Sequence, residues 1–251
     1  MTGSVDIVTK DHVLEIHLNR PDKKNAVTAE MYAAMADAIA TAGADPGICA
    51  VLFAGRGETF CAGNDLNDFL SNPITAGSPV LRFLNAIATW ETVMIAAIQG
   101  SCVGIGATLL LHCDYVVATD TASLQFNFVK IALVPEAASS LLLPRAVGRL
   151  KAAELMLLGE PLAAFEAHAL GLISDVVEDG DCLGKARSFA ARLSALPPEA
   201  VRATRKLLRS ETEGIVARMA EENAVFAQRL CSPEFKEAVS AFLQKRKPNF
   251  G

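Results

Sequence analysis

The sequence predicts an α/β fold, in which short buried strands alternate with helices around one large core. Three short apolar segments, Ala50–Ala54, Val93–Ile98 and Tyr115–Ala118, are typical of parallel strands buried on both faces. Segments with helical spacing of apolar residues stand between and after them. The 251 residues are 51% hydrophobic and 20% charged, which suffices for a sizeable core and excludes a disordered chain.

The first half of the chain carries the alternating elements. Val13–Leu18 alternates in polarity and predicts a strand, and Thr28 caps a helix that runs to about Gly43. The elements that follow are a strand at Ala50–Ala54, a helix at Val80–Trp90, a strand at Val93–Ile98, a helix from about Gly104 to Cys113 and a strand at Tyr115–Ala118. This order favours parallel pairing, because each crossover needs a helix.

The second half becomes purely helical after a proline pair at Pro197-Pro198. Before the pair we expect helices at Leu150–Leu158, Ala163–Leu170 and Cys182–Leu196, and a strand at Ile173–Val177; after it we expect helices at Glu199–Arg209 and Ile215–Leu230, and a last one opened by Ser232-Pro233. The chain therefore divides into an α/β core over residues 1–196, which holds the site, and a helical region over residues 197–251. That region packs on the core or on a neighbouring subunit.

Composition and motifs exclude several classes of function. The net charge of −5 argues against nucleic acid as a partner, and six scattered cysteines without metal spacing argue against a metal site. The uncharged stretch Thr92–Cys113 is long enough for a membrane span, but polar residues and three glycines interrupt it, so we expect no membrane segment. Nucleotide-binding and serine-hydrolase motifs are absent: Gly100–Gly104 has cysteine where a G-x-S-x-G motif needs serine.

Two glycine-containing segments follow predicted strands, Phe60–Leu66 and Gly100–Gly106. Each can present a backbone N–H group outside the strand ladder, and two such groups that converge on one carbonyl form an oxyanion hole. The glycines also fit ordinary tight turns. Their order and separation favour the first interpretation.

Five motifs in order resemble the crotonase (enoyl-CoA hydratase/isomerase) superfamily, over nearly the whole chain. They are the stretch Leu18–Val27, the two glycine segments, the Leu170–Ile173 signature and the final helix around Phe242–Pro248. The resemblance implies a crotonase-type spiral of ββα turns and a C-terminal helical trimerisation region. It also implies an acyl-CoA substrate and assembly as a homotrimer or a dimer of trimers.

The resemblance assigns residues to the site as well. The N–H groups of Asn64 and Ile105 would hold the thioester oxygen. Residues expected to bind the substrate or its CoA moiety are Lys23, Lys24, Ala26, Ala62, Gly63, Asp65, Leu66, Gly104, Phe128 and Lys245. The lysines fit equally well as solvated side chains, and Asp65 also fits a helix cap. No separate cofactor or metal is implied, because coenzyme A is part of the substrate.

The branch of the superfamily follows from acidic residues. Hydratases of this kind use two glutamates, and the matching positions here are Thr108 and Phe128, which cannot serve as acid and base. Glu136 lies instead among apolar neighbours, which would raise its pKa and suit proton transfer near neutral pH. It could also be an acid in the first turn of a helix. The stretch Pro135–Ser140 resembles the peroxisomal-type Δ3-Δ2-enoyl-CoA isomerases.

The predicted function is therefore isomerisation of 3-enoyl-CoA to 2-trans-enoyl-CoA, with Glu136 carrying a proton from C2 to C4. The alternatives are another acyl-CoA reaction of the superfamily (hydration, hydrolysis or decarboxylation) and a catalytically silent binding protein. The C-terminus lacks a peroxisomal S-K-L signal, so we expect a cytoplasmic protein.

Overall fold

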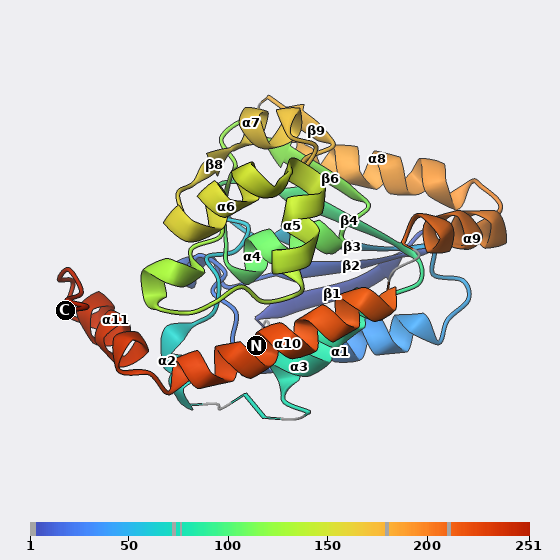
Figure 1. Ribbon diagram of the computed structural model, residues 1–251. Helices are drawn as coiled ribbons and strands as arrows, with labels where there is room; N and C mark the ends of the chain where they lie inside the picture. Colours follow the sequence, from blue (N-terminus) through green and yellow to red (C-terminus); the bar gives the residue numbers. More distant parts are fainter. Residues whose placement is uncertain (1–3, 72–73, 76, 179–180, 210–211) are drawn as a thin grey trace.

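A six-stranded sheet forms the centre of the molecule (Figure 1). The computed structural model describes residues 4–71, 74–75, 77–178, 181–209 and 212–251. In sheet order, the strands are β1 (Val5–Lys10), β2 (Val13–Leu18), β3 (Ala50–Gly55), β4 (Val93–Ile98), β6 (Tyr115–Thr119) and β9 (Asp175–Val177). In this sheet, β2, β3, β4, β6 and β9 pair in parallel with their neighbours, and β1 pairs with β2 antiparallel. The predicted α/β class and parallel pairing are confirmed, and the edge strand β1 is an addition.

A second, three-stranded sheet lies beyond the end of the first. It contains β5 (Ser101–Val103), β7 (Ser123–Gln125) and β8 (Leu162–Ala163), with β7 in the middle. Strand β5 follows β4 after a turn at Gly100, and β7 follows β6 in the same way. The bridge between Cys61 and Cys102 places the segment after β3 beside β5. Successive strand pairs of this kind, each followed by a helix, form the expected ββα repeat.

Eleven helices are described, together with three short 3-10 turns. The helices are α1 (Ala29–Gly43), α2 (Leu66–Ser71), α3 (Pro79–Thr89), α4 (Ile105–Thr108), α5 (Ser139–Val147), α6 (Arg149–Leu158), α7 (Ala164–Ala169), α8 (Cys182–Ser194), α9 (Pro198–Leu208), α10 (Thr212–Leu230) and α11 (Pro233–Leu243); the 3-10 turns are η1 (Pro21–Lys23), η2 (Leu109–His112) and η3 (Phe128–Ile131). The helix expected over Gly104–Cys113 is in fact the single turn α4 followed by η2.

The large sheet separates two apolar layers, as the alternation along its strands requires. In β3, Leu52 faces the layer beneath α8, whereas Val51 and Phe53 face the main core with α1 and α3. Figure 1 shows α8 on one side of the sheet and α1 and α3 on the other. Because both faces are covered, the strand residues are nearly all buried, which explains the continuous apolar runs of β3 and β4.

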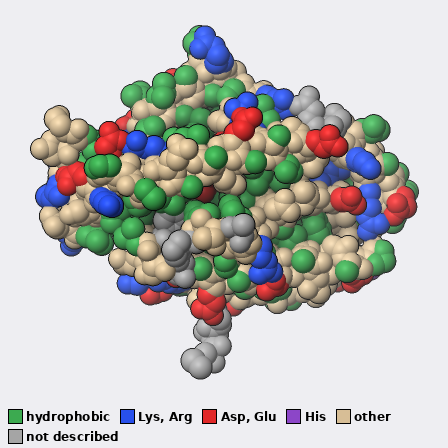
Figure 2. Space-filling model, turned by 60° about the horizontal axis from the view of Figure 1, so that its bottom comes forward, with side chains coloured by type: hydrophobic (Ala, Val, Ile, Leu, Met, Phe, Trp, Pro, Cys, Tyr) green, Lys and Arg blue, Asp and Glu red, His purple; other side chains and the backbone are tan. Residues whose placement is uncertain are grey.

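The C-terminal helices fold back onto the same chain. The buried Arg205 of α9 donates from Nε to Asp114 Oδ2 at 2.6 Å, and α10 packs on α3 and α5. Figure 1 shows α10 crossing the front of the molecule, with α11 at its end. In Figure 2, apolar side chains cover much of the middle of the face that is turned forward. None of the helices within the described ranges is long and apolar enough to cross a membrane.

Candidate active site

A cavity of about 410 Å³ lies where the two glycine turns meet the loop before α5. Its walls come from both regions of the chain, because α10 and α11 contribute side chains to it. The lining residues are Lys23, Lys24, Ala26, Ala62, Gly63, Asn64, Asp65, Leu66, Asn67, Val103, Gly104, Asn127, Phe128, Ile131, Leu133, Glu136, Phe226, Phe242 and Leu243. The wall is mostly apolar, with a few polar groups at one side.

The first glycine turn presents a free backbone donor. Val27 donates from its N–H to Gly63 O at 2.8 Å and accepts at its own carbonyl from Asp65 N at 2.9 Å. In such a parallel bridge, the N–H of Asn64 between these two bonds points away from Val27. Within the described part of the chain, this N–H makes no hydrogen bond. The side chain of Asn64 is occupied, because its Oδ1 accepts from the Tyr32 hydroxyl at 2.6 Å.

The second turn presents another donor from the start of α4. Gly104 adopts φ 54° and ψ −118°, which is accessible essentially only to glycine. A Cβ built on Gly104 would lie 3.9 Å from Gly63 Cα, so the two turns face each other closely. The N–H of Ile105, the first residue of α4, has no hydrogen-bond partner among the described residues, as expected for a helix start. The Ile105 side chain is buried in the core and does not line the cavity.

Glu136 is the one acidic side chain deep in this cavity among the described residues, since only 3% of its surface is exposed. Its Oε1 is buried and has no hydrogen-bond partner there. Burial, with a smaller contribution from the charge of Glu222, raises the pKa of Glu136 to about 8. Such a carboxyl can both take up and release a proton near neutral pH.

The alternative role for Glu136, as an acid in the first turn of a helix, is wrong. Helix α5 begins only at Ser139, and the intervening Ala137 and Ala138 both have positive φ, 58° and 56°. Their left-handed backbone separates Glu136 from the helix axis. The carboxyl therefore belongs to the cavity and not to the end of α5.

Most of the residues expected in the site lie together. Of the catalytic candidates, Asn64 and Glu136 line the cavity, and Ile105 directly follows Gly104, which does. Lys245 is not a lining residue in this single chain; the neighbouring Phe242 and Leu243 take that place. Asp65 caps α2, because its Oδ1 accepts from Asn67 N at 3.1 Å and from Asp68 N at 3.2 Å. It also accepts from Arg20 at 2.6 Å through Oδ2.

Several contributors carry no local sequence signal. Tyr32 on α1 and Glu222 on α10 are buried polar residues that contact site residues from distant parts of the chain. Phe226 and Leu243 belong to amphipathic helices, and the apolar face of such a helix predicts burial without naming what it covers. The residues close in sequence to Asn64 and Glu136 do not indicate which distant side chains contact them.

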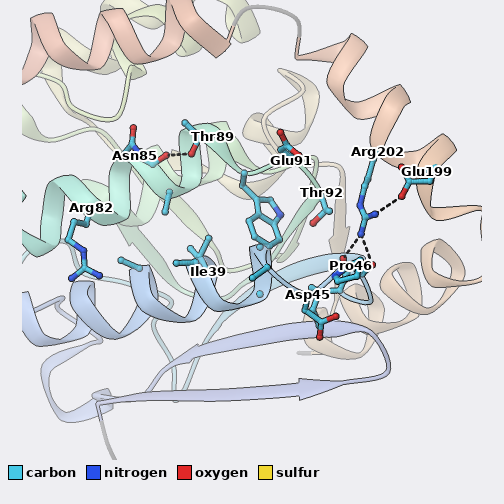
Figure 3. Close-up of a pocket in the computed structure, with 18 residues that line it drawn as sticks. Ile39, Asp45, Pro46, Arg82, Asn85, Thr89, Glu91, Thr92, Glu199 and Arg202 are labelled. Atoms are coloured by element: carbon cyan, nitrogen blue, oxygen red, sulfur yellow. Dashed lines mark hydrogen bonds and ion pairs between the residues drawn. The ribbon is translucent and has the colours of Figure 1, made fainter.

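A larger groove of about 710 Å³ lies between α1, α3 and the start of α9 (Figure 3). Both of its arginines are engaged with the protein itself. Arg202 donates to Glu199 Oε1 and to Pro46 O, both at 2.6 Å, and Arg82 pairs with Asp37. It lies apart from Glu136 and from both glycine turns, so its size does not make it the reactive site. Among the described residues, no group of three or more His, Cys, Asp or Glu could hold a metal ion.

A ββα spiral with a buried carboxyl, in a cavity that two glycine turns also line, is typical of an enzyme of the crotonase type. The sequence profile of the enoyl-CoA hydratase/isomerase family matches residues 8–251. The chain belongs to this family, and it is a crotonase-family enzyme of acyl-CoA substrates.

Individual relatives agree with this assignment. The 1,2-epoxyphenylacetyl-CoA isomerase of Escherichia coli K12 is 36% identical over 249 residues, covering 95% of this chain and 94% of that protein. The peroxisomal enoyl-CoA delta isomerase 3 of mouse is 30% identical, covering 96% and 78%. The crystal structure of an enoyl-CoA hydratase/isomerase from Pseudoalteromonas atlantica T6c superposes with a TM-score of 0.94 at 42% identity, covering 99% of this chain and all of that one. The names include isomerases and hydratases, so they define the family and not the reaction.

Proposed function

We propose that this enzyme isomerises 3-enoyl-CoA to 2-trans-enoyl-CoA with Glu136 as its only acid–base group. The observation that carries the proposal is the buried, unpartnered Oε1 of Glu136 in the cavity that the Asn64 and Gly104 turns also line. A reaction that moves one proton between two carbons on one face of a chain needs one such group. Hydration by the usual pair of glutamates would need two, and Thr108 and Phe128 stand at those positions.

In the proposed reaction, the thioester carbonyl oxygen accepts hydrogen bonds from the N–H groups of Asn64 and Ile105. The Glu136 carboxylate removes a proton from C2, and the electron pair of the C–H bond delocalises over the dienolate. The negative charge develops on the oxygen, where the two prepositioned donors stabilise it. Protonated Glu136 then returns the proton to C4, and the double bond moves from C3–C4 to C2–C3.

The charge stabilisation depends on donors that are already oriented in the free enzyme. Loss of one donor of this type typically costs about 10²–10³ in rate. Both donors here are backbone groups on turns held by other bonds: Val27 fixes the first turn, and Gly104 N donates to Gln125 O at 3.0 Å in the second. The enzyme would therefore need little reorganisation as the charge develops.

A paired assay tests the proposal. Purified protein receives 3-trans-hexenoyl-CoA in one cuvette and 2-trans-hexenoyl-CoA in another, and the absorbance of the conjugated enoyl thioester is followed. The proposal expects a rise with the first substrate and no fall with the second. A fall with the second and no rise with the first would identify a hydratase and contradict it.

A further inference from the structure

The peptide group between Ala137 and Ala138, one residue after Glu136, is held by a hydrogen bond at its carbonyl and another at its N–H. The carbonyl of Ala137 accepts from Nε2 of the buried His112 at 2.8 Å, and the N–H of Ala138 donates to Glu222 Oε2 at 2.7 Å. This carbonyl and this N–H belong to one planar peptide group. Two bonds from opposite sides, one from η2 and one from α10, therefore determine the orientation of that plane.

The backbone at this point needs such support. Ala137 and Ala138 are both left-handed, a conformation that is unfavourable for a residue with a Cβ. Glu222 adds a third bond, because its Oε1 accepts from Ser140 N at 2.9 Å. The carboxylate thus spans the loop and the first turn of α5 with both oxygens. Release of these bonds would let the loop relax toward ordinary backbone and turn the Glu136 side chain.

His112 acts as a neutral donor in this arrangement. A carbonyl can only accept, so Nε2 carries the proton of the imidazole, and Nδ1 is buried without a partner among the described residues. Burial lowers the pKa of His112 to about 4, which keeps the ring uncharged across the neutral range. His112 therefore contributes orientation and no charge.

Glu222, in contrast, places a buried negative charge near Glu136. Tyr32 and Cys61 also lie near Glu136, but burial is the main cause that raises the pKa of each, and both stay uncharged at neutral pH. Burial raises the pKa of Glu222 itself, whereas its hydrogen bonds from Ser140 and Ala138 and the charge of Arg218 favour the ionised form. A fixed negative charge beside a carboxylate increases its affinity for a proton.

From this geometry we infer that Glu222 is a positioning residue for Glu136: its carboxylate accepts from Ala138 N and Ser140 N and so fixes the loop over residues 137–140, and its negative charge lies near the Glu136 carboxyl. The inference deepens the proposed function and rests on it for the role of Glu136. It also makes α10, in the C-terminal helical region, a working part of the active site. No local motif of the sequence indicates this connection.

Three variants separate the two contributions of Glu222. Glu222→Gln keeps the length and removes the charge, and Glu222→Asp keeps the charge and shortens the reach. Glu221→Gln is the matched control, because Glu221 is the exposed neighbour on the same helix. The pH dependence of kcat/KM with 3-trans-hexenoyl-CoA is measured for each. For Glu222→Gln we expect the midpoint to move to lower pH and the plateau to fall about tenfold, since a weaker base removes the proton more slowly.

Glu222→Asp should keep the midpoint and lose about tenfold in kcat, because the shorter side chain cannot reach both N–H groups. Glu221→Gln should match the wild type in both respects. A residue that only stabilises the fold would lower the melting temperature without moving the midpoint. An unmoved midpoint in a folded Glu222→Gln enzyme overturns the inference. If that variant does not fold, wild-type kcat in Glu222→Asp overturns it instead.

A second readout does not depend on turnover. Infrared difference spectra over a pH titration follow the C=O stretch of the protonated, buried carboxyl, which is assigned to Glu136 by its loss in Glu136→Gln. The titration midpoint of this band should move to lower pH in Glu222→Gln and stay unchanged in Glu221→Gln. If Glu136→Gln still isomerises at the wild-type rate, the proposed function fails, while the band still decides whether Glu222 acts on Glu136.

Discussion

The hydroxyl of Tyr32 donates a 2.6 Å hydrogen bond to Oδ1 of Asn64, and this bond joins helix α1 to the wall of the cavity. The bond holds the Asn64 side chain by its Oδ1, while the backbone N–H of Asn64 makes no hydrogen bond among the described residues. A buried tyrosine without a role in proton transfer thus supports the orientation of a proposed oxyanion donor.

Tyr32→Phe should therefore affect the rate more than the affinity. The ring keeps its contact with Phe83, whose centroid lies 5.4 Å away, but Asn64 Oδ1 loses its partner. We expect kcat to fall about tenfold with little change in KM, and the free energy of unfolding to fall by about 1–3 kcal/mol. Steady-state kinetics and urea unfolding measure both. Tyr115→Phe, in the stacked pair with Phe189, is the control, and an equal loss of kcat there would contradict the explanation.

Glu136→Gln should abolish isomerisation. The amide cannot accept the C2 proton, and general-base catalysis of this kind contributes about 10²–10⁴ in rate. The assay with 3-trans-hexenoyl-CoA measures the loss, and Glu221→Gln should retain the wild-type rate. Full activity in Glu136→Gln would show that Glu136 is not the base.

The activity should rise with pH. Glu136 must be ionised to take the C2 proton, and burial raises its pKa to about 8, so kcat/KM should increase through a midpoint near pH 8. A profile measured from pH 5 to 10 checks this expectation. A plateau already reached at pH 6 would show that the rate depends on another group.

Stability should change in the opposite direction. The pKa of Glu136 is raised from 4.5 to about 8 in the folded protein, so between these values the native state binds a proton that the unfolded state has released. This contribution to stability is complete below about pH 4.5 and is lost as the pH rises through 8. Glu136→Gln lacks it, so its stability relative to the wild type should grow from pH 5 to pH 9 in urea unfolding. The same pH dependence of the free energy of unfolding in both proteins would contradict the argument that burial raises the pKa of Glu136.

Gly104→Ala should damage the second donor. A Cβ cannot be accommodated at φ 54° and ψ −118° without strain, and relief of that strain would move the N–H of Ile105. We expect a loss of about 10²-fold in kcat. Gly214→Ala on α10 is the matched control, because nothing lies within 4 Å of its Cβ position. That change should raise the free energy of unfolding by about 0.5–1 kcal/mol.

The lysines of the first motif should affect the CoA part of the substrate. Lys23 and Lys24 line the cavity, so each Lys→Ala change should raise KM for an acyl-CoA about two- to fivefold. The effect should shrink at high salt and should be absent with a short pantetheine thioester that lacks the nucleotide phosphates. Lys247→Ala, near the exposed C-terminus, should leave KM unchanged. Equal effects on both thioesters would argue against phosphate contacts.

Local patterns predict the larger sheet well and the smaller one poorly. Strands β2, β3 and β4 match their predictions at nearly every residue, because β2 alternates in polarity and burial on both faces leaves continuous apolar runs in β3 and β4. Strands β5 and β8 have three and two residues, too few for any period, and they form through pairing with β7 and, for β5, also with Cys61. Helix α5 follows two left-handed alanines and contains Pro144, neither of which predicts a helix.

The site divides in the same way. Asn64, Gly104 and Glu136 are assigned by the resemblance to the family, because composition alone also allows ordinary tight turns at the glycines and a helix-start role for the acid. Tyr32 and Glu222 act through hydrogen bonds to residues far away in sequence, and no window around either predicts its partner. Long-range contacts of this type are decided by the assembled fold.

The 84 residues that separate Ala138 from Glu222 have a consequence for the order of events in synthesis and folding. The loop that carries Glu136 leaves the ribosome well before α10 exists. Formation of the Glu222 contact closes a long stretch of chain, and contacts of such separation form late. The sheet can thus be complete while the base still lacks its support. On the proposed roles of Glu136 and Glu222, full catalytic competence requires that α10 has docked, even when the sheet is already complete.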